Sequence, residues 1–313
     1  MPIRLVFFGT AELASASLEA LAGDPRFEML AVVTQPDKPR GRDMQVQPSA
    51  VKASALRLNL PVLQPKRARD PVFIQQICAL APELGVVVAY GQILPQALLD
   101  VPPHGFVNVH TSLLPKHRGA APIQAALLAG DPETGVTIMQ MDAGLDTGPI
   151  LSQRTSPIHD EDNSQTLHDR LAKAGAELLL ETLPKYLAGE IKPQPQPEGA
   201  TYAGKIEKKH GQIDWNEPAE VIARKIRAFT PWPGAYTTFE IGGKARLVKI
   251  WKAQVQNVQG AAGTILQLDA RQLVIGCATN ALSLIEVQME GGKRMPIQEF
   301  LTGHRPDRVP AND

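Results

Sequence analysis

The feature that most constrains the fold is an alternation, in the first half of the chain, between short apolar runs and longer segments of helical character. The apolar runs are nearly continuous, as expected of strands buried on both faces, and they occupy residues 3–8, 29–34, 84–89, 106–110 and 135–140. The segments between them have helical periodicity or propensity and occupy residues 11–22, 49–59, 71–80 and 119–130. This alternation predicts an α/β fold with a doubly wound, mostly parallel, Rossmann-like sheet.

The sequence changes character after residue 187. Residues 163–187 have the pattern of one long helix, and GEIKPQPQPEGA then follows at 189–200, where three prolines at every second position favour an extended chain. We therefore predict three parts: a catalytic domain at 1–189, a Pro-rich linker at 190–204 and a second domain at 205–313.

The last third of the chain is rich in short β segments separated by turn signals. One helical pattern, EPAEVIARKIRAF, interrupts them; its apolar positions form a buried stripe and leave Arg224, Lys225 and Arg227 more exposed. Several short strands and one helix in about 100 residues predict a small, partly open β-barrel of the OB type.

Composition excludes several classes of protein. Hydrophobic residues make up 43% of the chain, which is enough to bury a core in both domains and excludes a disordered protein. Cys78 and Cys277 lie far apart in unlike stretches, which favours buried thiols over a disulfide framework. No run of apolar residues is long enough to span a membrane, and the N-terminus lacks the pattern of a signal peptide. We expect a cytoplasmic protein with no membrane contact.

Polar residues at the carboxyl end of a predicted strand indicate where the chemistry lies, because ligands of open α/β sheets bind at that edge. Asn108 and His110 are two positions apart on one strand, so their side chains share a face. An amide and an imidazole side by side can polarise a carbonyl group and stabilise its oxyanion. The loop MQMDAGLDTG after the next strand offers Asp142 and Asp146 as the carboxylate that orients the imidazole, although an aspartate in such a loop is more often a turn or capping residue than a catalytic one.

Other chemistries fit less well. Ser112 lies two residues after His110, but it lacks the G-x-S-x-G environment of a hydrolase nucleophile. The first strand ends in FFGTAELA, which has neither a dinucleotide fingerprint nor a P-loop. Histidine and cysteine spacings do not match a metal site, so we predict none. The loop at 36–48 is long and charged, which fits either a functional loop or a solvated surface.

Taken together, these motifs resemble the methionyl-tRNA formyltransferases over essentially the whole chain. The most specific parts are NVHTSLLPKHRGAAPIQAALLAGD and ETGVTIMQMDAGLDTG, and VVTQPDKPRGR, VVVAYGQILP, ATYAGKI, PWPGA and GKRM occur in the same order as in that family. The chain departs from the family where GTAELA replaces the usual GTPEFA.

The resemblance implies transfer of the formyl group of 10-formyltetrahydrofolate to the α-amino group of methionine on initiator tRNA, without a covalent enzyme intermediate. It places Asn108, His110 and Asp146 at the catalytic positions. It implies folate contacts from nine residues: Val88, Tyr90, Gly91, Gln92, Ile93, Ser112, Leu113, Leu114 and Pro115. It implies tRNA contacts from Lys38, Arg40 and Arg42. We expect further tRNA contacts from the basic residues Lys208 and Lys209 of the second domain, in a protein that we expect to be a monomer.

Two alternatives remain after this comparison. A formyltransferase could act instead on an amino sugar nucleotide or another small amine. A chain with a degenerate catalytic domain could serve only as a tRNA-binding module, although the intact N-x-H and D-T-G motifs disfavour this.

The charge of the whole chain is zero, with 32 basic and 32 acidic side chains, which at first argues against nucleic acid. The two parts differ, however. Residues 1–204 carry 17 basic and 21 acidic side chains, a net charge of −4, whereas residues 205–313 carry 15 and 11, a net charge of +4. The basic part can meet phosphates through KIEKKHG and the cations of the predicted helix. This modest charge predicts a few phosphate contacts and a modest dependence on salt.

Overall fold

The computed structural model describes residues 1–40 and 45–309, which divide into two compact units. Unit 1 comprises Met1–Pro122, Glu133–Pro157 and His168–Ala203. Unit 2 comprises Ile123–Pro132, Ile158–Leu167 and the chain from Gly204 onward.

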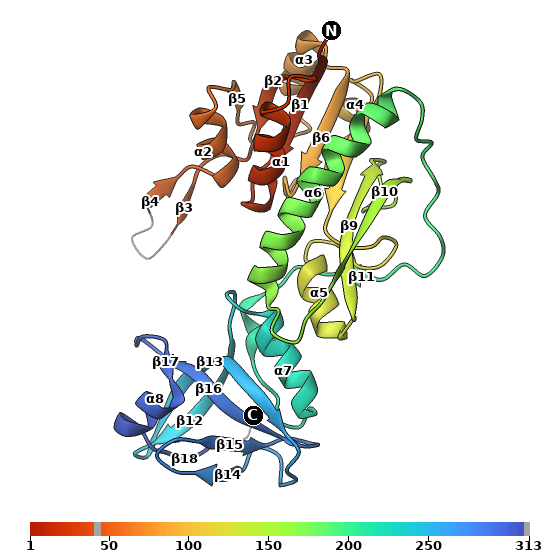
Figure 1. Cartoon of the computed structure of the whole chain (residues 1–313). Coiled ribbons are helices and arrows are strands. Elements are labelled where there is room, and N and C mark those ends of the chain that lie inside the picture. The colour runs from red at the N-terminus through yellow and green to blue at the C-terminus, as the bar shows by residue number, and fades with distance from the viewer. Residues whose placement is uncertain (41–44, 310–313) are drawn as a thin grey trace. The chain divides into compact units, whose positions relative to one another are not determined.

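Unit 1 is built on a sheet in the order β10-β9-β7-β6-β1-β2-β5 (Figure 1). The strands β1, β2, β5, β6 and β7 are parallel, β9 is antiparallel to β7, and β10 is antiparallel to β9. Their bounds are β1 (Ile3–Gly9), β2 (Phe27–Val33), β5 (Val62–Leu63), β6 (Leu84–Val88), β7 (Phe106–His110), β9 (Glu133–Gln140) and β10 (Ile150–Pro157). The predicted mostly parallel sheet is confirmed, and the two antiparallel pairings, β7 with β9 and β9 with β10, lie at one edge.

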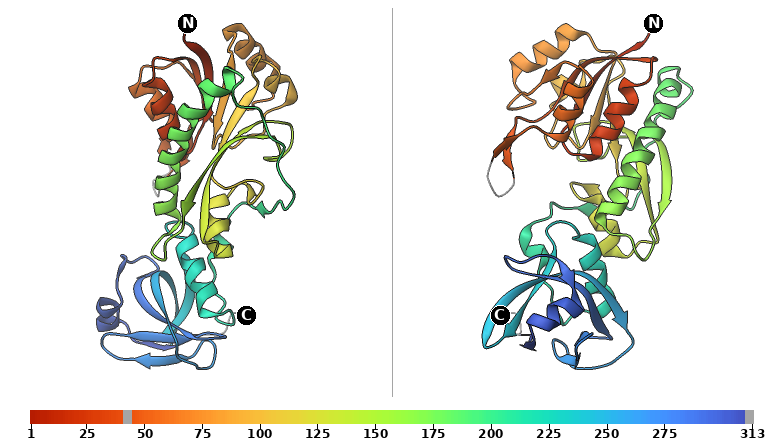
Figure 2. Two further views of the ribbon diagram at one scale, coloured as in Figure 1. Left: turned by 45° about the vertical axis from the view of Figure 1, so that its right-hand side comes forward. Right: turned by 60° about the vertical axis from the view of Figure 1, so that its left-hand side comes forward.

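Helices cover both faces of this sheet, as the two views of Figure 2 show. On one face, Phe73, Ile77 and Leu98 from two helices pack against Phe8 and other sheet residues. On the other face, Gly175 of the long helix lies against Val109 and Val136. The helices are α1 (Leu13–Ala22), α2 (Ala50–Arg57), α3 (Pro71–Leu80), α4 (Gln96–Leu99) and α6 (Ser164–Leu187).

Local sequence explains where these helices begin. The side chains of Ser49 and Asp70 each accept a hydrogen bond from a backbone N–H of the first turn of α2 and α3, and Pro71 occupies the first position of α3. Asn163 does the same for α6, because its Oδ1 accepts from the N–H groups of Gln165 and Thr166.

An extended segment at residues 190–203, called here the connecting segment, runs along unit 1. Gln194 forms a β-bridge with Ile150, and β11 (Tyr202–Ala203) pairs in parallel with β8 (Arg118–Gly119). The prolines do keep the chain extended, as the sequence predicts. The connecting segment belongs to unit 1 as far as Ala203.

Unit 2 contains a strongly curved antiparallel sheet in the order β14-β15-β16-β13-β12-β18, with β17 also paired to β16. These strands are β12 (Ala235–Ile241), β13 (Lys244–Gln256), β14 (Ile265–Leu268), β15 (Leu273–Gly276), β16 (Ala281–Met289), β17 (Met295–Pro296) and β18 (Pro306–Arg308). The predicted barrel-like fold is confirmed. Its core includes Ile222 and Ile226 of the helix α7 (Ala219–Ala228) together with Phe239, Val248 and Ile250.

Four shorter features complete the described chain. The strands β3 (Lys38–Arg40) and β4 (Gln45–Gln47) pair antiparallel. The helix α5 (Pro122–Ala129) precedes β9. In unit 2, a 3-10 turn at Lys208–Gly211 and a helix α8 (Ile297–Gly303) accompany the sheet.

One prediction about a side chain is wrong: Cys78 is exposed, because it lies on the outer side of α3, whereas Cys277 is buried as predicted. Arg224, Lys225 and Arg227 are partly exposed, more so than the buried Ile222 and Ile226 of the same helix, as the pattern predicts. None of the helices within residues 1–40 and 45–309 combines the length and apolar character needed to cross a bilayer.

Candidate active site

A cavity of about 570 Å³ opens at the carboxyl ends of β1, β6 and β7 in unit 1. This is the edge at which α/β sheets bind ligands. Its lining includes Asn108 and His110 at the end of β7, and Asp146 from the loop between β9 and β10. The sheet therefore brings together the three residues that the sequence predicts to be catalytic.

Asp146 lies between the two residues of β7. Asn108 Nδ2 donates to Asp146 Oδ1 at 3.3 Å, and His110 Nδ1 lies 3.7 Å from Asp146 Oδ2. The second distance is too long for a hydrogen bond but suits an ion pair with a protonated ring. The side chains of His110 and Asp146 are 6% and 16% exposed, so both groups are shielded from bulk water while one edge stays open to the cavity.

The imidazole of His110 is oriented from its other nitrogen. Nε2 lies 3.0 Å from the backbone oxygen of His117, and because a carbonyl oxygen can only accept, Nε2 must carry the proton in this bond. Nδ1 therefore faces Asp146. A ring held in this way can exchange a proton with a bound substrate at Nδ1.

The carboxylate of Asp146 has a backbone partner as well. Gly119 N–H donates to Asp146 Oδ2 at 2.8 Å. The other candidate, Asp142, is a turn residue, since its carboxylate accepts from Gly144 N–H and from the Thr147 hydroxyl. The structure thus separates two aspartates that residue type alone leaves equivalent.

The loop after β6 forms another wall of the cavity. Its main chain is held by Tyr90, whose backbone oxygen accepts from the Thr10 hydroxyl at 2.8 Å and from Gln35 Nε2 at 2.9 Å. The apolar lining includes Leu13, Met139 and Met141, which the sequence did not single out. Only the position of Leu13 in a motif that departs from GTPEFA could have drawn attention to it.

The nine residues predicted to contact folate do not all line this cavity. Tyr90, Gly91, Gln92 and Ile93 do. Val88 is fully buried within β6, and the lining of this cavity includes none of Ser112, Leu113, Leu114 and Pro115.

The segment at 112–115 lies behind the site. Ser112 is fully buried, and its hydroxyl donates to the backbone oxygen of Lys116 at 2.6 Å. Leu114 N–H donates to the Thr137 hydroxyl at 3.1 Å. In this structure these residues brace the turn that carries His117.

The residues predicted to contact tRNA lie in several places. Lys38 is on β3, where its Nζ donates to Gln35 Oε1 at 2.8 Å, and Arg40 ends that strand. Arg42 lies outside the described residues. Lys208 and Lys209 are exposed on the 3-10 turn of unit 2, and Lys209 Nζ lies 2.9 Å from Glu207.

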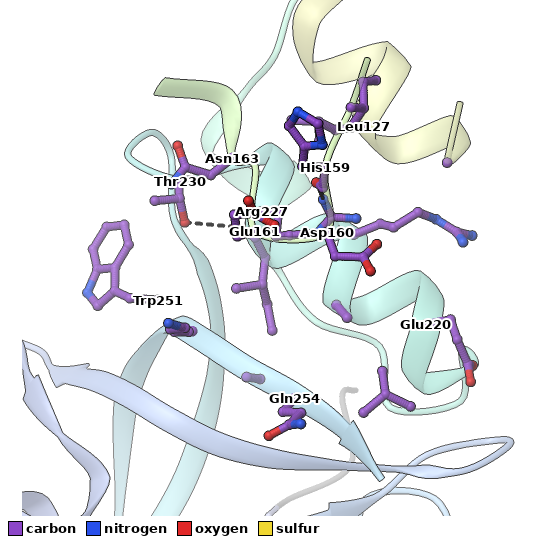
Figure 3. Close-up of a pocket in the computed structure, with 18 of the residues that line it drawn as sticks. Leu127, His159, Asp160, Glu161, Asn163, Glu220, Arg227, Thr230, Trp251 and Gln254 are labelled. Atoms are coloured by element: carbon purple, nitrogen blue, oxygen red, sulfur yellow. Dashed lines mark hydrogen bonds between the residues drawn. The ribbon is translucent and has the colours of Figure 1, made fainter. Parts of the chain in front are cut away.

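A second cavity, of about 960 Å³, lies in unit 2 and is lined by charges of both signs (Figure 3). Asp160 and Glu161 lie on one side and Trp251 on the other. Arg227 donates to the backbone oxygens of His159 and Asp162, and burial lowers its pKa from the usual value. Its guanidinium is therefore committed to unit 2 and is poorly placed to meet phosphates.

The described residues include no group of three or more His, Cys, Asp or Glu side chains arranged to hold a metal ion.

Comparisons with known proteins show which families the chain matches. The family model described as formyl transferase matches residues 3–183, and the model of the formyl transferase C-terminal domain matches residues 205–305. Methionyl-tRNA formyltransferase of Dechloromonas aromatica is 48% identical over 303 residues, which cover 96% of each chain. The protein of the same name from Myxococcus xanthus is also 48% identical, over 96% of this chain and 95% of its own.

Solved structures show the same fold at lower identity. An N-formyltransferase from Helicobacter canadensis, in complex with folinic acid and dTDP-3-aminofucose, has a TM-score of 0.68 at 19% identity, and the match covers 90% of this chain and 98% of that one. HypX from Aquifex aeolicus, in complex with tetrahydrofolic acid, has a TM-score of 0.64 at 19% identity. The match covers 100% of this chain but 51% of HypX, so the chain spans about half of that protein.

Proposed function

The chain belongs to the methionyl-tRNA formyltransferase family of formyl-transferring enzymes, and on this premise we propose that it formylates the α-amino group of methionine on initiator tRNA. The donor in this proposal is 10-formyltetrahydrofolate. The observation that carries it is the convergence of Asn108, His110 and Asp146 on one cavity, because these groups match the needs of the reaction.

The reaction requires an anion to be stabilised and protons to be moved. When a neutral amine attacks the formyl carbon, the carbonyl oxygen becomes an oxyanion. The amide of Asn108 and a protonated His110 donate hydrogen bonds to it. The nitrogen of the attacking amine must lose a proton and the leaving nitrogen of the folate must gain one. His110 Nδ1, beside Asp146, is placed to give its proton to the leaving nitrogen and then to take the proton that the amine loses, so that the ring returns to its starting state.

No covalent intermediate is needed in this mechanism. Both substrates are held against the same strand end, so positioning replaces a slow encounter in solution. The hydroxyl nearest in sequence, that of Ser112, donates to a backbone oxygen and is fully buried. It has no role as a nucleophile.

We place the folate in the cavity of unit 1. A volume of about 570 Å³ is in the range of small-molecule sites, and the mixed lining suits a flat heterocycle with polar edges. Tyr90, Gly91, Gln92 and Ile93 are the proposed contacts. Val88 and the residues at 112–115 do not line the cavity. We propose that they support its walls.

We place the tRNA on basic residues of both units, namely Lys38, Arg40, Arg42, Lys208 and Lys209. The proposed division is catalysis in 1–189, a linker at 190–204 and tRNA binding in 205–313. The names of the relatives support this role, and they also support a cytoplasmic location. A monomer is our proposal for the oligomeric state, to be measured by light scattering.

The experiment is a formylation assay with 10-formyltetrahydrofolate and methionyl-tRNA, in which initiator and elongator tRNA are compared. We expect turnover on initiator tRNA and a loss of at least about 100-fold in His110→Ala and Asp146→Ala. Asn108→Asp should be equally damaging, because it replaces a hydrogen-bond donor by a charge that repels the oxyanion and Asp146. Undiminished activity in these variants would refute the catalytic assignment. Turnover of an amino sugar nucleotide with none on charged tRNA would refute the substrate.

A further inference from the structure

The connecting segment contacts the loop that carries Asp146. The amide of Gln196 makes four hydrogen bonds there. Its Nε2 donates to the backbone oxygens of Asp146 and Gly148, both at 2.8 Å. Its Oε1 accepts from Arg118 Nε at 3.1 Å and from Arg118 Nη2 at 2.6 Å. The donors and acceptors of this side chain are therefore directed to the two loops that form the site.

Arg118 links Gln196 to Gly119, whose backbone N–H also holds Asp146. The next residue, Gly119, donates its N–H to Asp146 Oδ2, and β8, which contains both residues, pairs with β11 of the connecting segment. The main chain of Asp146 is thus held by Gln196, and its carboxylate is held by the loop that Gln196 also contacts.

Asp146 needs this support because its backbone is in an unfavourable conformation. Its φ is +52°, in the left-handed region that residues other than glycine seldom adopt. The loop around it has no regular secondary structure. Such a residue keeps its conformation only where the surroundings hold it. A small rotation here would move the carboxylate away from Asn108 and His110.

We propose that Gln196 is a positioning residue, which keeps the carboxylate of Asp146 directed at His110 and Asn108 during formyl transfer. This role rests on the proposed function, because it concerns the formyl-transfer reaction. It gives the connecting segment, which the sequence predicts only to be a linker, a part in the site. Gln196 does not line the cavity and touches no reacting atom.

A purely structural role would be to fasten the connecting segment to unit 1. Other contacts do this without Gln196. The bridge between Gln194 and Ile150 uses backbone atoms, and the Thr201 hydroxyl accepts from His117 N–H at 2.8 Å. Removal of the Gln196 side chain should therefore leave the segment in place and affect chiefly Asp146.

The test compares Gln196→Ala and Gln196→Glu with Gln194→Ala as the matched control. Gln194 lies in the same segment, and its side chain donates only to the nearby backbone oxygen of Lys192 among the described contacts. We expect kcat to fall about tenfold in Gln196→Ala with KM within about twofold, since a slightly misplaced catalytic group slows the reaction. Gln196→Glu retains the contact with Arg118 but loses both donor bonds, so it should be no better. Gln194→Ala should match the wild type.

A double-mutant cycle separates positioning from general damage. In single-turnover assays, Gln196→Ala added to Asp146→Asn should cause little further loss, because the group it positions is already changed. Full additivity of the two losses would overturn the proposal. So would a wild-type kcat in Gln196→Glu.

A measurement without substrate keeps this test independent of the proposed function. The ¹⁵N chemical shift of His110 Nδ1 should move in Gln196→Ala in the same direction as in Asp146→Asn, and should stay unchanged in Gln194→Ala. An unmoved resonance in Gln196→Ala would refute the positioning role. Absence of formylation by the wild type, with the shift observed, would refute only the assigned reaction.

Discussion

At the scale of single residues, the site depends on backbone groups that can act only as a hydrogen-bond donor or only as an acceptor. His117 contributes a carbonyl oxygen that can only accept, and Gly119 contributes an N–H that can only donate. The first fixes which nitrogen of His110 faces the cavity, and the second fixes one oxygen of Asp146. Backbone groups of this kind are insensitive to the identity of the side chain, so they leave little trace in a sequence.

Tyr90 presents the opposite case, a polar group without a partner. Its hydroxyl is buried and has no hydrogen-bond partner among the described residues, and its ring packs edge-on against Phe8. Burial raises the pKa of Tyr90 to about 12, from 10.0. Between these pH values the unfolded chain has released a proton that the folded chain retains, so stability falls as the pH rises.

We predict that Tyr90→Phe is at least as stable as the wild type at pH 7, because it removes an unsatisfied buried donor. Between pH 10 and 12 the free energy of unfolding of the wild type should fall by an amount on the order of 2 kcal/mol, and Tyr90→Phe should not show this fall. Urea unfolding at pH 7 and pH 11 checks both points. Tyr186→Phe is the control, since its hydroxyl donates to the backbone oxygen of His104 at 3.1 Å and its removal should destabilise. A large loss in Tyr90→Phe at pH 7 would mean that the hydroxyl has a partner such as a bound water.

At the scale of elements, the pairing of β8 with β11 depends on one glycine. Gly119 has a φ of +117°, and a Cβ there would meet the backbone oxygen of Ala203 at 2.6 Å. Backbone cannot move aside as a flexible side chain can, so the two short strands approach closely only without a side chain at this position.

We predict that Gly119→Ala lowers the free energy of unfolding by roughly 2–4 kcal/mol, from the positive φ and the clash together. Gly189→Ala is the matched control: its φ is +75°, but nothing lies within 4 Å of the added Cβ. This control should lose only about 1 kcal/mol. Chemical unfolding of both variants gives the comparison, and equal losses would show that the contact with Ala203 yields without cost.

The elements also show which parts of the fold a sequence can reveal. β7 and α3 have the predicted bounds, because a buried apolar run and a helix with an N-cap can each be recognised from neighbouring residues in the sequence. β10 was missed, since its sequence ILSQRTSP has polar residues on an exposed edge. Asn108 and His110 could be proposed as a pair because they share a strand, and Asp146 could be proposed because its loop resembles that of the family. Gln196 could not be found in this way, as its partners lie 48 to 78 positions away in the chain.

At the scale of the whole molecule, charge is distributed unevenly along a neutral chain. The net charge is −4 for residues 1–204 and +4 for residues 205–313. Lys225 and Arg227 are engaged within unit 2, the first with Glu217 at 2.6 Å. Fewer cations are therefore free for phosphates than the sequence predicts, which makes the exposed pair Lys208 and Lys209 more important.

We predict that Lys208→Ala combined with Lys209→Ala raises KM for tRNA and lowers the slope of log(kcat/KM) against log salt by about 1 to 2. The kcat at saturating tRNA should change little. Assays at several salt concentrations measure both, with the exposed Lys192→Ala in the connecting segment as the control. An unchanged salt slope would remove these lysines from the proposed tRNA surface.

The hydrogen bonds of Gln196 affect when the site can form during synthesis of the chain. A chain leaves the ribosome from its N-terminus, and domains begin to fold as they emerge. His110 and Asp146 are made early, yet the residue that steadies their loop appears some 50 positions later. A nascent chain stalled at residue 189 would contain the reactive groups without their support, whereas one released beyond Ala203 would contain both. The site is therefore expected to mature in two stages during synthesis, with the second set by the arrival of the connecting segment.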